Sequence, residues 1–181
     1  MRPIFTIHAG EYLVASHIET TFKGLNVWVP SKDTGVDLLV TDKANKKTVS
    51  LQVKFSKDFL IDNSTSFLRE NLEAWGWWTL FPKKMKESVA DLWVFTLMSI
   101  HSKKIQYVVI SPKKLHEMFT SLHGKKDKWQ IYLMVTKKGG CWETRGLSKD
   151  DQILIAKGEY SEPKRDLSQY VDNWEKVKSI T

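Results

Sequence analysis

Three side chains suited to phosphodiester hydrolysis lie close together in the sequence. Asp37 lies in the apolar run GVDLLV, and Gln52 and Lys54 lie in the next such run, LQVKFS. Hydrolysis of this bond needs a divalent cation on oxygen ligands, which activates water, and a positive group that stabilises charge developing on the phosphate. Asp37 offers the cation a carboxylate, Gln52 an amide oxygen, and Val53 its carbonyl. Lys54 offers the positive group, which would hold the attacking water or a phosphoryl oxygen.

The order of apolar and polar residues predicts a β-hairpin that brings these side chains to one face. Apolar and polar residues alternate over 49–55, so Gln52 and Lys54 leave the same side of a strand, about 7 Å apart. The β-rich run 36–41 precedes this strand, and a polar segment joins the two as an antiparallel hairpin. Asp37 then lies opposite either Gln52 or Lys54, and directly opposed residues share a face.

The remaining elements alternate between helices and strands. Residues 10–22 carry apolar groups at helical spacing, and they predict an amphipathic helix. A second helix is expected over 67–75, with Ser64 or Thr65 as its cap. Strands are expected at 27–29, 91–99, 105–110 and 129–136, helices at 112–122 and 166–177, and either a helix or a strand at 149–156. This order predicts an α/β domain with a central mixed sheet.

The motif residues and their order resemble the PD-(D/E)xK nuclease superfamily. GVDLLV at 35–40 and LQVKFS at 51–56 are similar to its catalytic strands, and GEYLVASHIE at 10–19 is similar to the first core helix of small bacterial members. The resemblance implies that Glu11 adds to the metal site beside Asp37, Gln52 and Val53. DLWVFTL and YVVISPKKL resemble the later strands and helix of the group, so the resemblance covers about residues 8–120.

The same resemblance implies a fold. It is the restriction endonuclease-like αβββαβ core, in which helices flank a central mixed sheet. We expect this core over about residues 8–136 of a single domain that spans 1–181, with the C-terminal tail packed on it.

Two positions depart from the superfamily pattern. Thr34-Gly35-Val36 replaces its Pro, and Gln52 replaces its acidic residue, which resembles the QxK variant of Mrr-like restriction enzymes and some intron-encoded endonucleases. A neutral amide binds a cation more weakly than a carboxylate does. The site therefore either needs Glu11 for negative charge or has lost catalysis.

The resemblance implies a metal-dependent endodeoxyribonuclease, with Mg²⁺ or Mn²⁺ as cofactor, that acts on DNA in restriction, defence or repair. One such domain cuts one strand, so cleavage of both strands needs a homodimer or a second protein subunit. An alternative is a catalytically inactive module of the same fold that binds DNA or a partner protein. A third hypothesis is an RNA nuclease or RNA-binding protein.

The composition favours a polyanionic partner and a cytoplasmic location. The 28 Lys and Arg residues against 21 Asp and Glu give a formal charge of +7, which favours nucleic acid as a partner. The single cysteine, Cys141, excludes an intramolecular disulfide and a Cys-rich zinc site, as expected in a reducing compartment. No apolar run approaches the roughly 20 residues that cross a bilayer, so no membrane is expected. Trp75, Trp77 and Trp78 precede several lysines in a mixture that suits DNA or a partner protein, although at least two of them are expected in the core.

Overall fold

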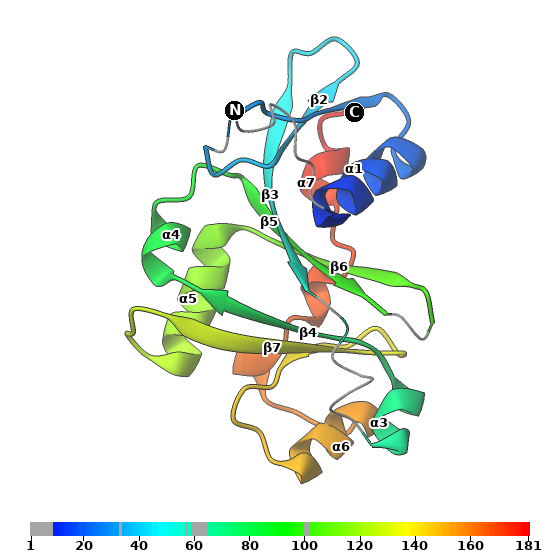
Figure 1. Ribbon diagram of the computed structural model, residues 1–181, viewed down its shortest axis with the longest axis vertical. Helices are drawn as coiled ribbons and strands as arrows, with labels where there is room; N and C mark the ends of the chain where they lie inside the picture. Colours follow the sequence, from blue (N-terminus) through cyan, green and yellow to red (C-terminus); the bar gives the residue numbers. More distant parts are fainter. Residues whose placement is uncertain (1–8, 33, 57, 59–64, 100–101) are drawn as a thin grey trace, which may run out of the picture.

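The computed structural model describes residues 9–32, 34–56, 58, 65–99 and 102–181, which form two β-sheets packed among helices (Figure 1). The first sheet contains β1 (Leu25–Trp28), β2 (Leu38–Asp42), β3 (Thr48–Ser56), β5 (Leu92–Met98) and β6 (Ile105–Ile110). The second contains β4 (Leu72–Leu80), β7 (Trp129–Thr136) and β8 (Cys141–Glu143). The described helices are α1 (Ala9–Thr21), α3 (Ser66–Asn71), α4 (Pro82–Lys86), α5 (Pro112–His123), α6 (Lys149–Lys157) and α7 (Glu175–Lys178). None of these helices has the length and apolar character needed to cross a bilayer.

The first sheet is mixed, with strand order β1-β2-β3-β5-β6. Strands β1, β2 and β3 form an antiparallel meander, β5 lies parallel to β3, and β6 lies antiparallel to β5. The expected hairpin is confirmed as β2 and β3, with Leu38 opposite Leu51 and Val40 opposite Val49. The expectation of an α/β fold with a central mixed sheet is also confirmed.

The alternation of residues in β3 buries one face of the first sheet beneath α1. Val49 and Leu51 of β3 form one apolar cluster with Val14 and Ile18 of α1. Val14 and Ile18 are four residues apart, so they lie on one side of the helix. The C-terminal helix α7 lies beside α1 over the same face (Figure 1) and contributes to the same cluster.

The second sheet covers the opposite face of the first. Trp78 of β4 packs edge-on against Phe95 of β5, with ring centroids 5.0 Å apart, and both side chains are buried. Helix α5 adds Leu115 and Phe119 to this core. On the outer face of the second sheet, α3 and α6 pack over a third apolar cluster. The layers therefore run from α1 and α7, through the first and second sheets, to α3 and α6 (Figure 1).

The helix expected over 67–75 is wrong beyond Asn71, where α3 ends. Thr65 caps α3 as expected, because its side chain accepts a hydrogen bond from the first turn at 3.4 Å. The chain then enters β4, in which the first five residues are all buried, with Trp78 toward the first sheet and Trp75 toward α3 and α6. A strand buried on both faces lacks the alternation of apolar and polar residues. Its apolar residues therefore fitted a helical spacing as well as a strand.

Strand β4 and helix α4 interrupt the element order that the sequence predicts. Between the parallel strands β3 and β5, the expected single helix is replaced by α3, β4 and α4. Ser64, the other expected cap, lies outside the described residues. Two of the three clustered tryptophans are buried as expected, since Trp75 is 8% and Trp78 6% exposed, whereas Trp77 is 36% exposed.

The C-terminal tail is less helical than the sequence predicts. The segment 166–177 contains a 3-10 turn at Ser168–Tyr170 and the start of α7 instead of one helix. Asp172 has a positive φ of 49°, which interrupts helical conformation. Its amide donates a hydrogen bond to the Tyr107 carbonyl at 2.7 Å, which attaches the tail to β6. The ambiguous segment 149–156 is helical and forms α6.

Candidate functional site

Asp37 lies immediately before β2, where regular pairing with β3 stops. Leu38 is opposite Leu51 in the register of the two strands, yet the amide of Asp37 also donates to the Leu51 carbonyl, at 2.8 Å. The Asp37 carboxylate then takes the place of a backbone acceptor, because its Oδ2 accepts a hydrogen bond from the Val53 amide at 2.6 Å. The carboxylate is thereby held against the backbone of β3 at the centre of the QxK motif.

The side chains before and after Asp37 point to opposite faces of the sheet. Val36 packs against the core between the two sheets, whereas Leu38 is fully buried in the core beneath α1. Residues two apart on a regular strand share a face, so the chain is not a regular strand at Asp37. The carboxylate consequently lies near the plane of the sheet, where it meets the Val53 amide.

The carbonyl of Val53 lies on the same edge of β3 as this carboxylate. In a β-strand, the amide and the carbonyl of one residue point to the same neighbouring strand. The Val53 amide points toward Asp37, so the carbonyl also points to the β2 side, beyond the last regular pair at Leu51. One anionic oxygen and one neutral oxygen, each able to ligate a cation, therefore lie along this edge.

Gln52 and Lys54 project from the face of β3 opposite α1. The Lys54 ammonium lies over the ring of Trp93, 5.1 Å from its centroid, and Trp93 is buried between the two sheets. Alternation along β3 puts Gln52 on the same face, and Trp93 is its register partner on β5. The ammonium is therefore drawn back to the level of Gln52, and the face of the indole ring attracts it there.

Glu11 lies in the first turn of α1, at the C-terminal end of β3. A Cβ on the preceding residue, Gly10, would stand 2.6 Å from the Cβ of Phe55, so glycine permits this close approach of helix and strand. Phe55 adjoins Lys54, but α1 covers the opposite face of the sheet. The structure thus brings the other four predicted residues together along β3 and places Glu11 at the end of that strand, on the α1 side.

Two further residues help to position the motif: Trp93, which sequence reasoning missed, and Ser56, for which a solvated loop was expected. Trp93 supports the Lys54 ammonium, and only the pairing of β3 with β5 brings it there. The Oγ of Ser56 accepts a hydrogen bond from the Trp77 amide at 2.9 Å, which attaches the end of β3 to β4. Ser56 stands two residues after Lys54, so alternation alone puts it on this face, whereas the first part of its partner strand was expected to be a helix.

The chemistry of the donor set fits a hard cation. Asp37 and Glu11 carry carboxylates, Gln52 an amide oxygen and Val53 a carbonyl, and Mg²⁺ and Mn²⁺ prefer oxygen ligands. In the part of the chain that the structure describes, no three His, Cys, Asp or Glu residues are grouped so as to hold a metal ion. A cation at β3 would therefore depend on Gln52 and Val53 as well as on the acids.

A buried carboxylate that the sequence pattern does not reveal lies on β8. Glu143 is 0% exposed, and it accepts hydrogen bonds from the Arg165 guanidinium at 2.8 Å, the Arg145 amide at 2.9 Å and the Tyr132 amide at 3.3 Å. Burial raises the pKa of Glu143 to about 7, although the two amides and Arg165 favour the charged form. This carboxylate attaches the tail to the second sheet through Arg165.

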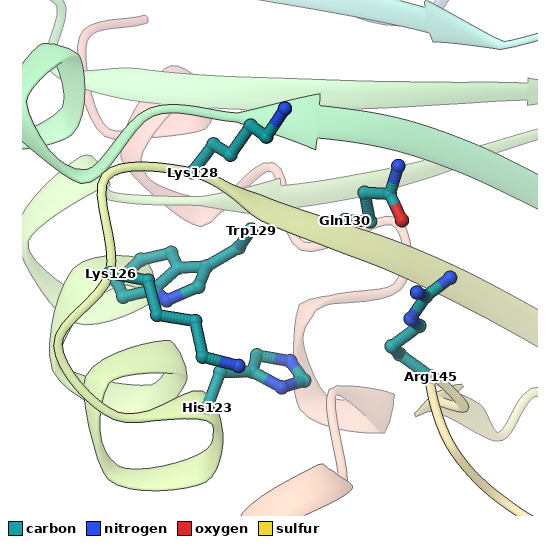
Figure 2. Close-up of a pocket in the computed structure, with 6 residues that line it drawn as sticks. All are labelled: His123, Lys126, Lys128, Trp129, Gln130 and Arg145. Carbon is teal, nitrogen blue, oxygen red and sulfur yellow. The ribbon is translucent and has the colours of Figure 1, made fainter.

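A basic hollow of about 250 Å³ adjoins this carboxylate (Figure 2). The described residues that line it are His123, Lys126, Lys128, Trp129, Gln130 and Arg145. The Nε2 of His123 lies 3.5 Å from the Glu143 carboxylate. Burial, followed by the charges of Arg165, Lys126 and Arg145, lowers the pKa of His123 to about 4, so its ring is neutral at pH 7. The positive charge of the hollow therefore comes from its two lysines and Arg145.

Comparison with known proteins gives no further assignment of the site. No family model matches the sequence, and no curated protein or solved structure matches the chain. The contacts around β3 and the motif residues themselves are therefore the features of this chain that bear on its function.

Proposed function

We propose that this chain is a Mg²⁺- or Mn²⁺-dependent endodeoxyribonuclease with a restriction endonuclease-like core. The hydrogen bond between the Asp37 carboxylate and the Val53 amide, 2.6 Å long, carries the proposal, because it joins the first motif strand to the second at the QxK residues. The order of α1, the meander β1-β2-β3 and the parallel strand β5 further supports it, with β4 as an insertion before β5.

Each motif residue has a distinct task in this proposal. Asp37, Gln52, the Val53 carbonyl and Glu11 would hold the cation. A bound divalent cation would neutralise charge on the phosphate and activate water. Lys54 stabilises the negative charge that develops on the phosphoryl oxygens, and the Trp93 ring keeps its ammonium at the level of Gln52.

Nicking of supercoiled plasmid in Mg²⁺ or Mn²⁺ tests this function. Asp37→Ala and Lys54→Ala should each lower the nicking rate by about 10²-fold or more, as expected when one charge-stabilising group is removed. Asp42→Asn is the matched control, because Asp42 also accepts backbone hydrogen bonds, at 2.6 and 2.9 Å, but lies at the other end of β2. Wild type that fails to nick, or Asp37 and Lys54 variants that nick as fast as Asp42→Asn, would refute the nuclease.

Gln52 favours a second candidate, a DNA-binding or partner-binding module of the same fold without catalysis. A neutral amide in place of a carboxylate weakens cation binding. Binding of DNA without metal-dependent nicking would support this module. Matched DNA and RNA duplexes in the same assay would reveal an RNA nuclease, and cleavage of both strands would indicate a homodimer or a second subunit.

A further inference from the structure

A second basic surface, the α4–α5 groove, lies on α4, α5 and the segment that leads into β7. It has a volume of about 620 Å³, and the described residues that line it include five lysines and one acid: Lys83, Lys84, Lys86, Lys125, Lys126 and Asp127. Its cations come from two segments about forty residues apart, which the packing of α4 on α5 brings together. The groove therefore attracts a polyanion.

The groove continues into the basic hollow beside Glu143. Lys126 and Trp129 line both, and the hollow adds Lys128 and Arg145 (Figure 2). One of the lysines, Lys83, has an exposed contact with Glu87 at 3.9 Å, which water and salt screen. A continuous track of cations of this kind suits successive phosphates of a nucleic-acid strand rather than a single anion.

An exposed aromatic ring stands in the groove. Phe81 is 43% exposed, and the Lys84 ammonium lies 5.6 Å from the centroid of its ring. Pro82 and Trp129 add apolar surface to the lining. Aromatic rings beside cations bind unpaired bases by stacking, whereas the bases of a duplex already stack on one another. The groove thus has the chemistry of a single-strand site.

Trp93 connects the groove to the candidate metal centre. One side of the connection is the Lys54 ammonium, which lies over the Trp93 ring. The other is the indole Nε1, which donates a hydrogen bond to the Oγ of Ser88 at 3.0 Å, and Ser88 follows α4 by two residues. One buried tryptophan side chain therefore links the motif residue Lys54 to the segment that follows α4.

We propose that the α4–α5 groove, together with the adjoining basic hollow, binds single-stranded DNA, with one base stacked on Phe81 and backbone phosphates on Lys125 and Lys126 of the groove and on Lys128 of the hollow. The choice of DNA rests on the proposed nuclease function, but binding to the groove does not require cleavage. In the proposed nuclease, this surface would hold an unpaired strand of the substrate.

Fluorescence anisotropy with a labelled thymidine oligonucleotide of about 20 nucleotides, in EDTA, tests the groove without cleavage. The triple variant K125A/K126A/K128A should bind at least about 10-fold more weakly. Its slope of log K against log salt should also be shallower by about 2, because each of the three lost phosphate contacts accounts for about 0.7 of that slope. Phe81→Ala should lower affinity for the single strand about 10-fold and leave that for a blunt duplex unchanged. The matched control is K137A/K149A/K157A, which removes three exposed lysines outside the groove.

Three results would overturn the proposal: unchanged binding by the groove variants, an equal loss in the control variant, or tighter binding of a duplex or of single-stranded RNA than of single-stranded DNA. Thermal unfolding of each variant establishes that it is folded. If wild type fails to nick plasmid yet binds the oligonucleotide through the groove, the nuclease is refuted and the groove is supported. If nicking depends on Asp37 while groove variants bind normally, the groove is refuted and the nuclease stands.

Discussion

The pH dependence of folding stability tests the unusual state of Glu143. Its side chain is 0% exposed and its pKa is raised from 4.5 to about 7, because burial penalises the charged carboxylate more than its hydrogen-bond donors stabilise it. This difference in pKa corresponds to about 3 kcal/mol between the two protonation states.

The sign of the effect follows from proton binding. The folded chain holds the Glu143 proton more tightly than the unfolded chain, so the contribution to stability is fully present below pH 4.5 and is lost as the pH rises through about 7. In the E143Q variant, the side chain is neutral at every pH. The free energy of unfolding of wild type relative to E143Q should therefore fall by about 3 kcal/mol as the pH rises over this range.

Urea unfolding followed by tryptophan fluorescence at a series of pH values measures this difference. His123 titrates in the same range with the opposite sense, because its pKa is lowered from 6.5 to about 4 and its contribution is lost as the pH falls. Both chains are therefore compared in the H123Q background. A difference that stays constant, or that grows as the pH rises, would show that Arg165 keeps Glu143 charged and would refute the reasoning.

Two further substitutions test local packing. Gly10→Ala should lower the free energy of unfolding by about 1–3 kcal/mol in urea unfolding, because its Cβ would lie 2.6 Å from the Cβ of Phe55. The same substitution should cost less in a Phe55→Gly background, which lacks that Cβ, and a G10A chain as stable as wild type would contradict the close approach. Ser148→Ala should cost about 1 kcal/mol, because it removes the capping box of α6, where the Ser148 side chain accepts a hydrogen bond from Asp151 at 3.1 Å. Thermal unfolding measures this loss, with Ser121→Ala as the control because Ser121 is also exposed. Equal stability of the two variants would exclude a role for the cap.

The hairpin was predictable because apolar and polar residues alternate along β3. The apolar residues of β3 face α1 and the polar ones face the other side of the sheet, and this period also restricts the register of the hairpin. Strand β4 has no such period, because the first sheet covers one side and α3 and α6 the other. Its residues Trp75 and Trp78 are buried on opposite faces, and local spacing cannot distinguish this arrangement from a helix.

The candidate site was predictable in its residues but not in its geometry. The motif spacing put Asp37 near Gln52 and Lys54, and the register of β2 and β3 agrees with it. The position of the carboxylate in the plane of the sheet depends on the irregular chain before β2, which no periodic pattern encodes. The support of Lys54 by Trp93 likewise depends on a parallel strand pair whose members lie about forty residues apart.

The neutral Gln52 changes the order in which a nuclease of this kind would bind its ligands. With one fewer negative charge at β3, the protein attracts a free cation less, while Lys54 and the α4–α5 groove attract phosphate more. Phosphate oxygens are themselves good ligands for Mg²⁺, which proteins often hold with few carboxylates plus the substrate. In the proposed nuclease, the DNA strand would then complete the cation site, so that cation and DNA would bind together, and the α4–α5 groove would compensate for the acid that the motif lacks.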